Sequence, residues 1–177
     1  PGSSYAIASA SSPDAGSYWV TVQDDNATTT SDTATLTVTG SASNYLQTGG
    51  TATLDGKAYA SSTSDQNAVK VIASGTLTLT NSTLTKSGDT ASEDNSNFKG
   101  INAGVLASVA ASESDPANAT TGSAITLSGC SISTASSGSN AVFAYGKGSS
   151  VTLDKVTITT TKDSSRGVDA TFGGRVT

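Results

Sequence analysis

The sequence predicts an all-β fold, namely a parallel β-helix of about four coils preceded by a short antiparallel β segment. A pattern of an apolar residue, Thr and Leu recurs from residue 51 onward, with successive copies 25, 48 and 26 residues apart. Apolar and polar residues alternate within each copy, and the 3.6-residue periodicity of amphipathic helices does not occur. A repeat of about 25 residues with two or three short strands has the size of one β-helix coil.

The composition is consistent with a narrow core. Ser and Thr make up 60 of the 177 residues, whereas Leu, Ile, Val and Phe together make up 30. This apolar share is below the roughly 20% at which chains become disordered, but the net charge of −5 is mild for such a chain. In a solenoid each coil contributes only a few apolar side chains, because much of the backbone bonds to the neighbouring coils.

The missing residue types exclude several chemistries. The chain has no His and one Cys, so it has no Ser-His-Asp or Cys-His catalytic group, no zinc site of the common kinds and no disulfide framework. Five carboxylates but no Lys or Arg precede Lys57, and nucleic acid is therefore not an expected partner. No apolar run reaches the length of a membrane span. Because the chain starts at Pro1, we expect it to be a piece of a longer protein.

Residues 1–40 are predicted to form an antiparallel meander, because short alternating runs are separated by turn residues. The three strands are expected at Tyr5–Ala8, Tyr18–Val22 and Ala34–Val38. A linker is expected at 41–50, before the repeats of 51–177.

One motif in the meander resembles a known fold family. Asp14, Gly16 and Tyr18 form Asp-x-Gly-x-Tyr just before the second strand, as in the tyrosine corner of immunoglobulin-like domains. The resemblance implies that 1–40 are the three C-terminal strands of such a domain. Val20 stands where the disulfide-forming Cys would be, which suggests a bacterial version without the disulfide. Tyr18 and Trp19 are expected to be core aromatics, or former core aromatics of the complete domain.

The repeats predict which side chains point inward. Successive copies start at Ala52, Leu77, Ile125 and Val151, and a fifth start lies at Val176. Because side chains alternate across a strand, stacked coils would form two internal ladders. These ladders are Leu54, Leu79, Leu127 and Leu153, and Tyr59, Leu84, Ile132 and Ile158.

A turn is expected between the two ladders. Its residue is Gly56, Asn81, Gly129 or Lys155, and all but Lys155 readily accept the positive φ that tight bends require. Cys130 follows this turn and is expected to be a packed thiol. A further strand of each coil is expected at Ala68–Val71, Ala141–Ala144 and Gly167–Ala170.

The 48-residue spacing is interpreted as one coil that carries two insertions. They are expected at 87–99 and 108–122, on either side of a strand at Ile101–Leu106. Long loops on a regular scaffold often carry function, so these insertions are the expected contact surface.

As a whole, 51–177 resemble the right-handed parallel β-helix proteins of the pectin-lyase-like superfold, in particular the Ser/Thr/Gly-rich repeats of bacterial surface and adhesin-like proteins. The superfold also includes polysaccharide lyases and glycoside hydrolases. A lyase would use Arg166 or Arg175 as base and Asp154 with Asp169 as Ca²⁺ ligands. The alternative is that these are solvated surface charges. A hydrolase needs carboxylates ~5–9.5 Å apart, and Asp55 and Asp154 are expected to be several coils apart.

The outward positions of the repeats form rows of hydroxyl groups. Such rows resemble those of ice-binding solenoids, although Thr is also simply suited to exposed strands. The central row is Thr53, Thr78, Thr126 and Thr152; the flanking rows are Thr51, Thr76, Ala124 and Ser150, and Asp55, Thr80, Ser128 and Asp154.

Two weaker motifs have ordinary explanations. Asn26, Asn81 and Asn118 each begin an N-glycosylation triplet, which chance produces often in a Thr-rich chain. The acidic runs 24–26 and 93–95 lack the spacing of a Ca²⁺ loop and are expected to be solvated turns.

These observations favour a structural and adhesive module of a secreted or wall-anchored bacterial protein, a stiff stalk that presents loops to glycans, host surfaces or neighbouring cells. Self-association through an open solenoid end is a further expectation. No catalytic, cofactor-binding or metal-binding residue is assigned. The alternatives are an enzyme fragment whose active site lies outside this segment, and an ice-binding solenoid.

Overall fold

The computed structural model describes residues 16–36 and 43–177. The chain divides into two compact units, the first ending at Ser41 and the second starting at Ala42. We describe each unit by itself.

The first unit is an antiparallel hairpin in its described part. Its strands are β1 (Gly16–Tyr18), β2 (Thr21–Gln23), β3 (Thr28–Thr30) and β4 (Ala34–Leu36). β1 pairs with β4 and β2 pairs with β3, both antiparallel. The predicted strand Tyr18–Val22 is therefore divided between β1 and β2. β3 was not predicted, and the strand expected at Tyr5–Ala8 lies outside the described residues.

Trp19 does not lie in a core of the described hairpin, so of the two expected positions only that of a former core aromatic remains. Its side chain is 62% exposed and that of Tyr18 is 37% exposed. The physical reason is that the described hairpin has one layer, and two strands without a second layer cannot enclose an aromatic ring.

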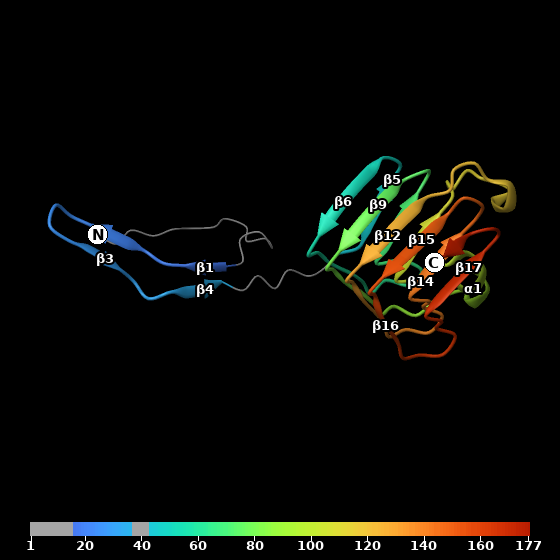
Figure 1. The fold of residues 1–177 in the computed structure, drawn as a ribbon. Coiled ribbons are helices and arrows are strands. Elements are labelled where there is room, and N and C mark those ends of the chain that lie inside the picture. Colours follow the sequence, from blue (N-terminus) through green and yellow to red (C-terminus); the bar gives the residue numbers. More distant parts are fainter. Residues whose placement is uncertain (1–15, 37–42) are drawn as a thin grey trace. The chain divides into compact units, whose positions relative to one another are not determined.

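The described residues of the second unit form three parallel sheets, which confirms the predicted β-helix (Figure 1). The first sheet contains β6 (Thr51–Asp55), β9 (Thr76–Thr80), β12 (Ala124–Ser128), β15 (Ser150–Asp154) and β18 (Arg175–Val176). The second contains β7 (Ala58–Ser61), β10 (Thr83–Lys86), β13 (Ser131–Thr134) and β16 (Thr157–Thr160). The third contains β5 (Tyr45–Thr48), β8 (Val69–Ile72), β11 (Val105–Ser108), β14 (Val142–Tyr145) and β17 (Val168–Thr171).

The strand register confirms both predicted ladders. Leu79 pairs with Leu54 and Leu127, and Leu153 extends the row. Leu84 pairs with Tyr59 and Ile132, and Ile158 extends the second row. The fifth start is also confirmed, because Val176 pairs with Val151.

The turns between the first and second sheets all use the left-handed region. Gly56, Asn81, Gly129 and Lys155 have φ values of 61°, 48°, 63° and 51°. The predicted turn column is therefore confirmed even at Lys155, where the side chain has to accept a conformation that costs a non-glycine residue free energy.

The core is a column of apolar side chains between the three sheets. Leu77, Leu79, Leu84, Ile125 and Leu127 are at most 1% exposed. The burial of each such side chain contributes about 1.5–3 kcal/mol to the free energy of folding. Much of this burial is against side chains of the neighbouring coils, so the stability of each coil depends on its neighbours.

The segment 41–50, expected to be a linker, contributes a strand to the solenoid. β5 pairs with β8, and the Tyr45 and Tyr59 rings are 5.2 Å apart. The Gln47 side-chain amide donates to the carbonyls of Gly49, Gly50 and Thr76. The linker interpretation fails because this segment supplies an apolar side chain and an amide to the first coil.

The long spacing is one coil with two insertions, as predicted, although the strand between them begins and ends later than the expected Ile101–Leu106. β11 lies between them; the first insertion contains α1 (Glu93–Lys99) and the second the short 3-10 helix η2 (Pro116–Asn118). α1 was not predicted. Ser92 caps its start, and Gly100 ends it with a φ of 64°. The helix has only seven residues, so no periodic apolar pattern accompanies these two signals.

Candidate functional site

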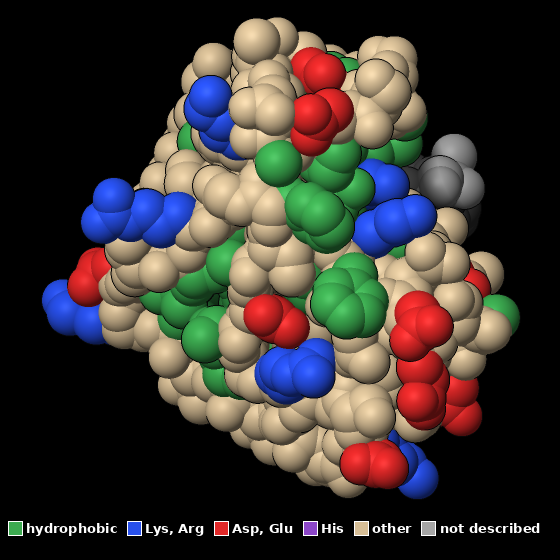
Figure 2. All heavy atoms as spheres, turned by 90° about the vertical axis from the view of Figure 1, so that its right-hand side faces the viewer, with side chains coloured by type: hydrophobic (Ala, Val, Ile, Leu, Met, Phe, Trp, Pro, Cys, Tyr) green, Lys and Arg blue, Asp and Glu red, His purple; other side chains and the backbone are tan. Residues whose placement is uncertain are grey.

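A groove of about 280 Å³ lies on the outer face of the third sheet. Val69 and Val71 of β8 face the core, so Lys70 and Ile72 face outward, and both line the groove. Leu106 of β11 and Tyr145 of β14 complete its floor. On the side where α1 and β17 lie, hydrophobic side chains gather between charged ones (Figure 2).

The two insertions form the walls of this groove. Lys99 at the end of α1 and Ile101 line one side. Val109, Ala110 and Glu113 of the second insertion line the other. The expected contact surface and the groove therefore involve the same two segments.

The first insertion (87–99) is anchored by polar contacts. The Thr90 hydroxyl and the Ala91 amide both donate to the Asp65 carboxylate, the former at 2.6 Å. The Ser96 hydroxyl donates to the Gly138 carbonyl. Below α1, Phe143 is fully buried, and a Cβ at Gly100 would lie 2.5 Å from its ring. The insertion is thus part of the folded structure.

A buried cation supports the start of this insertion. Lys86 is 1% exposed, and its ammonium group donates to the carbonyls of Thr63, at 3.0 Å, and Gly88, at 2.6 Å. Burial lowers the pKa of Lys86, while Asp65 and Asp89 oppose this shift. Lys86 joins the corner of one coil to the first residues of the insertion.

The second insertion (108–122) is closed by Glu113. Its carboxylate accepts hydrogen bonds from the Thr121 hydroxyl, at 2.8 Å, and the Thr120 amide, at 3.3 Å. The Lys147 amide donates to the Pro116 carbonyl at 2.8 Å, which ties the insertion to the next coil.

Further aromatic side chains lie beside Tyr145 of the groove, toward β17. The rings of Tyr145 and Phe172 meet edge to face, with centroids 5.5 Å apart. Phe172 and Phe98 are 46% and 56% exposed. The Thr171 hydroxyl donates to the Phe98 carbonyl at 2.7 Å, so β17 and α1 are in contact here. Burial raises the pKa of the Tyr145 hydroxyl.

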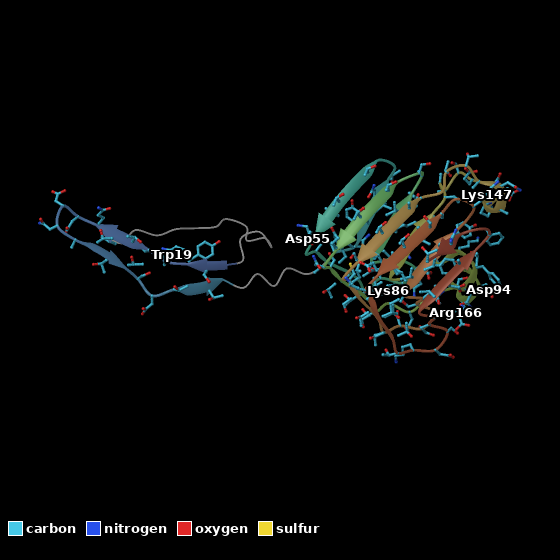
Figure 3. All side chains as sticks on the ribbon, viewed as in Figure 1. Trp19, Asp55, Lys86, Asp94, Lys147 and Arg166 are labelled. Atoms are coloured by element: carbon cyan, nitrogen blue, oxygen red, sulfur yellow. The ribbon has the colours of Figure 1, made fainter. Side chains whose placement is uncertain are left out.

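The structure brings together only two of the four lyase candidates, Arg166 and Asp169, and separates the two expected Ca²⁺ ligands, Asp154 and Asp169, onto different sheets. Arg166 lies beside α1, where its guanidinium donates to Asn97 at 2.8 Å and pairs with Asp169 at 3.4 Å (Figure 3). Asp154 and Arg175 belong to the first sheet, and the Asp154 carboxylate accepts a hydrogen bond from Ser128. Within 16–36 and 43–177, no group of three or more His, Cys, Asp or Glu residues is placed to hold a metal ion.

The hydroxyl rows are in register on the first sheet. Thr78 pairs with Thr53 and Thr126, and Thr126 pairs with Thr152. Asp55, in the flanking row that also contains Thr80, accepts hydrogen bonds from the Thr80 hydroxyl and the Asn81 side-chain amide. Asp55 and Asp154 lie on strands separated by β9 and β12, so they are about 14 Å apart by strand spacing, too far to act as a pair.

The remaining candidates have structural contacts. Cys130 is buried, as predicted, and its thiol is 3.3 Å from the Leu79 carbonyl. The Asp24 carboxylate accepts the Asn26 and Ala27 amides in the hairpin turn, and Glu93 and Asp94 occupy the first turn of α1. Of the three glycosylation triplets, Asn81 is held in a turn and Asn118 is bonded to Asp115.

No protein-family model, no curated protein and no solved structure matches this chain. Helices that combine the length and hydropathy needed to cross a bilayer do not occur in the described part of the chain.

The floor of the groove, unlike its walls, was not identified from the sequence, although a signal existed. Val105-Leu106-Ala107 and Ala141-Val142-Phe143-Ala144 are continuous apolar runs, whereas Thr76-Leu77-Thr78-Leu79-Thr80 alternates. A continuous run in a parallel sheet indicates burial on both faces. The runs therefore marked the outer face of the third sheet as the covered one.

Proposed function

We propose that the solenoid unit is a structural and adhesive module of an extracellular bacterial surface protein, and that it attaches to glycans through the groove between its two insertions. The observation that carries this proposal is the groove itself, with the outward-facing Tyr145 on its floor. Ligand sites are typically concave and largely apolar, with aromatic side chains and a few polar groups.

The scaffold supports this proposal. Three parallel sheets bond each coil to its neighbours, so the floor of the groove has little freedom to move. The walls are fixed by Asp65, Lys86 and Glu113 as described above. A fixed groove binds at a lower entropic cost than a loop that orders on binding.

The test is binding to a glycan array, followed by measurement of affinity for the best ligand. The variants are Tyr145→Ala and Phe172→Ala, and the matched control is Trp19→Ala, an exposed aromatic in the other unit. We expect the loss of Tyr145, or of the Phe172 ring that packs against it, to weaken binding about tenfold, and the control to leave binding unchanged.

Two results would contradict the proposal. One is a failure to bind any glycan of the array. The other is binding that persists after both insertions are replaced by short turns, provided that circular dichroism shows an intact β-helix.

For the hairpin unit we propose that residues 1–40 are the end of an immunoglobulin-like module. Support comes from the Asp-x-Gly-x-Tyr motif and the antiparallel pairing of β1 with β4. In a chain extended upstream of Pro1, a second layer would cover Trp19, the single Trp, and shift its fluorescence emission to shorter wavelength. An unshifted emission maximum would contradict this assignment.

A further inference from the structure

Lys70 occupies an unusual position for a lysine. It points outward from β8, between Leu46 on β5 and Leu106 on β11 in the strand register. Leu106 is nearly completely buried, and Lys70 itself is only partly exposed. The Lys70 side chain thus lines the floor of the groove, beside apolar residues of the neighbouring strands.

Nothing in the described residues neutralises this cation. The Lys70 side chain makes no hydrogen bond and no ion pair with any residue of 16–36 or 43–177. Burial lowers the pKa of Lys70, and no neighbouring carboxylate opposes the shift. A partly desolvated charge without a partner is unfavourable in the free protein, and an anion that enters the groove would remove this cost.

The groove lining contains one further cation and one anion. Lys99 lines it at the end of α1 and also has no ion pair within the described part of the chain. Glu113 is the acidic residue of the lining, and its carboxylate is already bonded to Thr120 and Thr121. The groove therefore offers two free ammonium groups in a chain whose net charge is −5.

We propose that the groove selects acidic oligosaccharides, and that Lys70 binds the anionic group, a carboxylate, sulfate or phosphate, while Tyr145 contacts the sugar ring. This inference rests on the proposed glycan binding and adds the charge of the ligand. Lys99 lies at the wall and adds a second, more solvated attraction.

The test compares pairs of oligosaccharides that differ only in charge. The pairs are a uronate oligomer and its carboxyl-reduced form, a sulfated oligomer and its desulfated form, and a phosphorylated oligomer and its dephosphorylated form. We expect the acidic member of at least one pair to bind tenfold or more tightly than its neutral partner, as a charge-assisted hydrogen bond implies. The pair that shows the difference identifies the anionic group.

Variants of Lys70 test its role. Lys70→Met retains most of the length of the side chain without its charge, and it should reduce the affinity for the acidic ligand most of the way to that of the neutral one. Lys70→Arg retains the charge and should bind within a few-fold of the unchanged protein. Lys162→Met, at an exposed lysine away from the groove, is the matched control and should change nothing. Circular dichroism and thermal unfolding establish that each variant is folded.

The outcomes separate this inference from the proposed function. Equal binding of acidic and neutral oligosaccharides, still dependent on Tyr145, would overturn the role of Lys70 and leave glycan binding intact. Full affinity in Lys70→Met would do the same. Binding to no oligosaccharide would overturn both. Equally tight, Lys70-dependent binding of hexaglutamate would overturn the assignment to a glycan, because an acidic peptide would then satisfy the groove.

Discussion

The first and third sheets come from the same coils, yet their outer faces differ in chemistry. The outer face of the first sheet carries the hydroxyl rows, in which Thr80 donates to Asp55 and Ser128 donates to Asp154. The outer face of the third sheet carries Leu106 and Phe143, both buried under the insertions. A parallel sheet thus remains bare where its outward residues are hydroxylated and acquires a covering layer where they are apolar.

The largest expected effect is a difference in the free energy of unfolding between variants on the two faces. Phe143→Ala should lower the free energy of unfolding by about 3–5 kcal/mol, because it removes a fully buried ring between β14 and Gly100. Thr126→Val on the first sheet should change it by less than about 0.5 kcal/mol, because that side chain is exposed. Urea unfolding followed by far-UV circular dichroism measures both. Similar losses in the two variants would show that the faces do not differ energetically.

A smaller effect is expected where the covering layer is attached. Lys86→Met removes the ammonium group that bonds the carbonyls of Thr63 and Gly88, and it should cost about 1–3 kcal/mol. The substitution should increase the rate of amide hydrogen exchange more in α1 than in β9 or β12, because the lost contact supports the first insertion. Lys162→Met is the control. Unchanged exchange in α1 would mean that Lys86 has no part in holding the insertion.

The smallest effect concerns the bare face and depends on pH. Hydrogen bonds from Thr80 and Asn81 lower the pKa of Asp55 below its ordinary value. A carboxyl with a lower pKa in the folded state stabilises the fold above its unfolded pKa, about 3.9, and this contribution is lost as the pH falls through the folded pKa. In Asp55→Asn the decline of stability below pH ~4 should be shallower than in the unchanged chain. Unfolding midpoints between pH 6 and pH 2.5 measure this slope, and identical slopes would contradict the role of Asp55.

The sequence was most informative where the repeats are regular. The pairing of Leu54 with Leu79 and of Leu127 with Leu153 follows from spacing alone, because a one-residue slip would turn every Leu outward. The turn at Lys155 was also placed correctly, since its neighbours in the coil dictate the bend more strongly than its own preference does.

The parts that were missed depend on contacts far apart in the chain. α1 is too short for a periodic pattern, and it forms where Asp65 and Gly138 hold its insertion. β5 depends on contacts with residues distant in the sequence, because Tyr45 packs against Tyr59 and the Gln47 side chain donates to the Thr76 carbonyl. The groove needs residues from β8, β11 and β14 together, so no single stretch of sequence contained it.

The groove is built on three successive strands of one sheet, β8, β11 and β14, so the length of the solenoid can change without altering the groove. Ser150 pairs with Arg175, so a duplicated copy of 150–174 would enter the solenoid in register and bring its own Lys155 turn. Each added coil would lengthen the molecule by about 4.8 Å along its axis. The distance between the groove and the C-terminal end of the solenoid can therefore be changed, in engineering or in evolution, while the residues that line the groove stay the same.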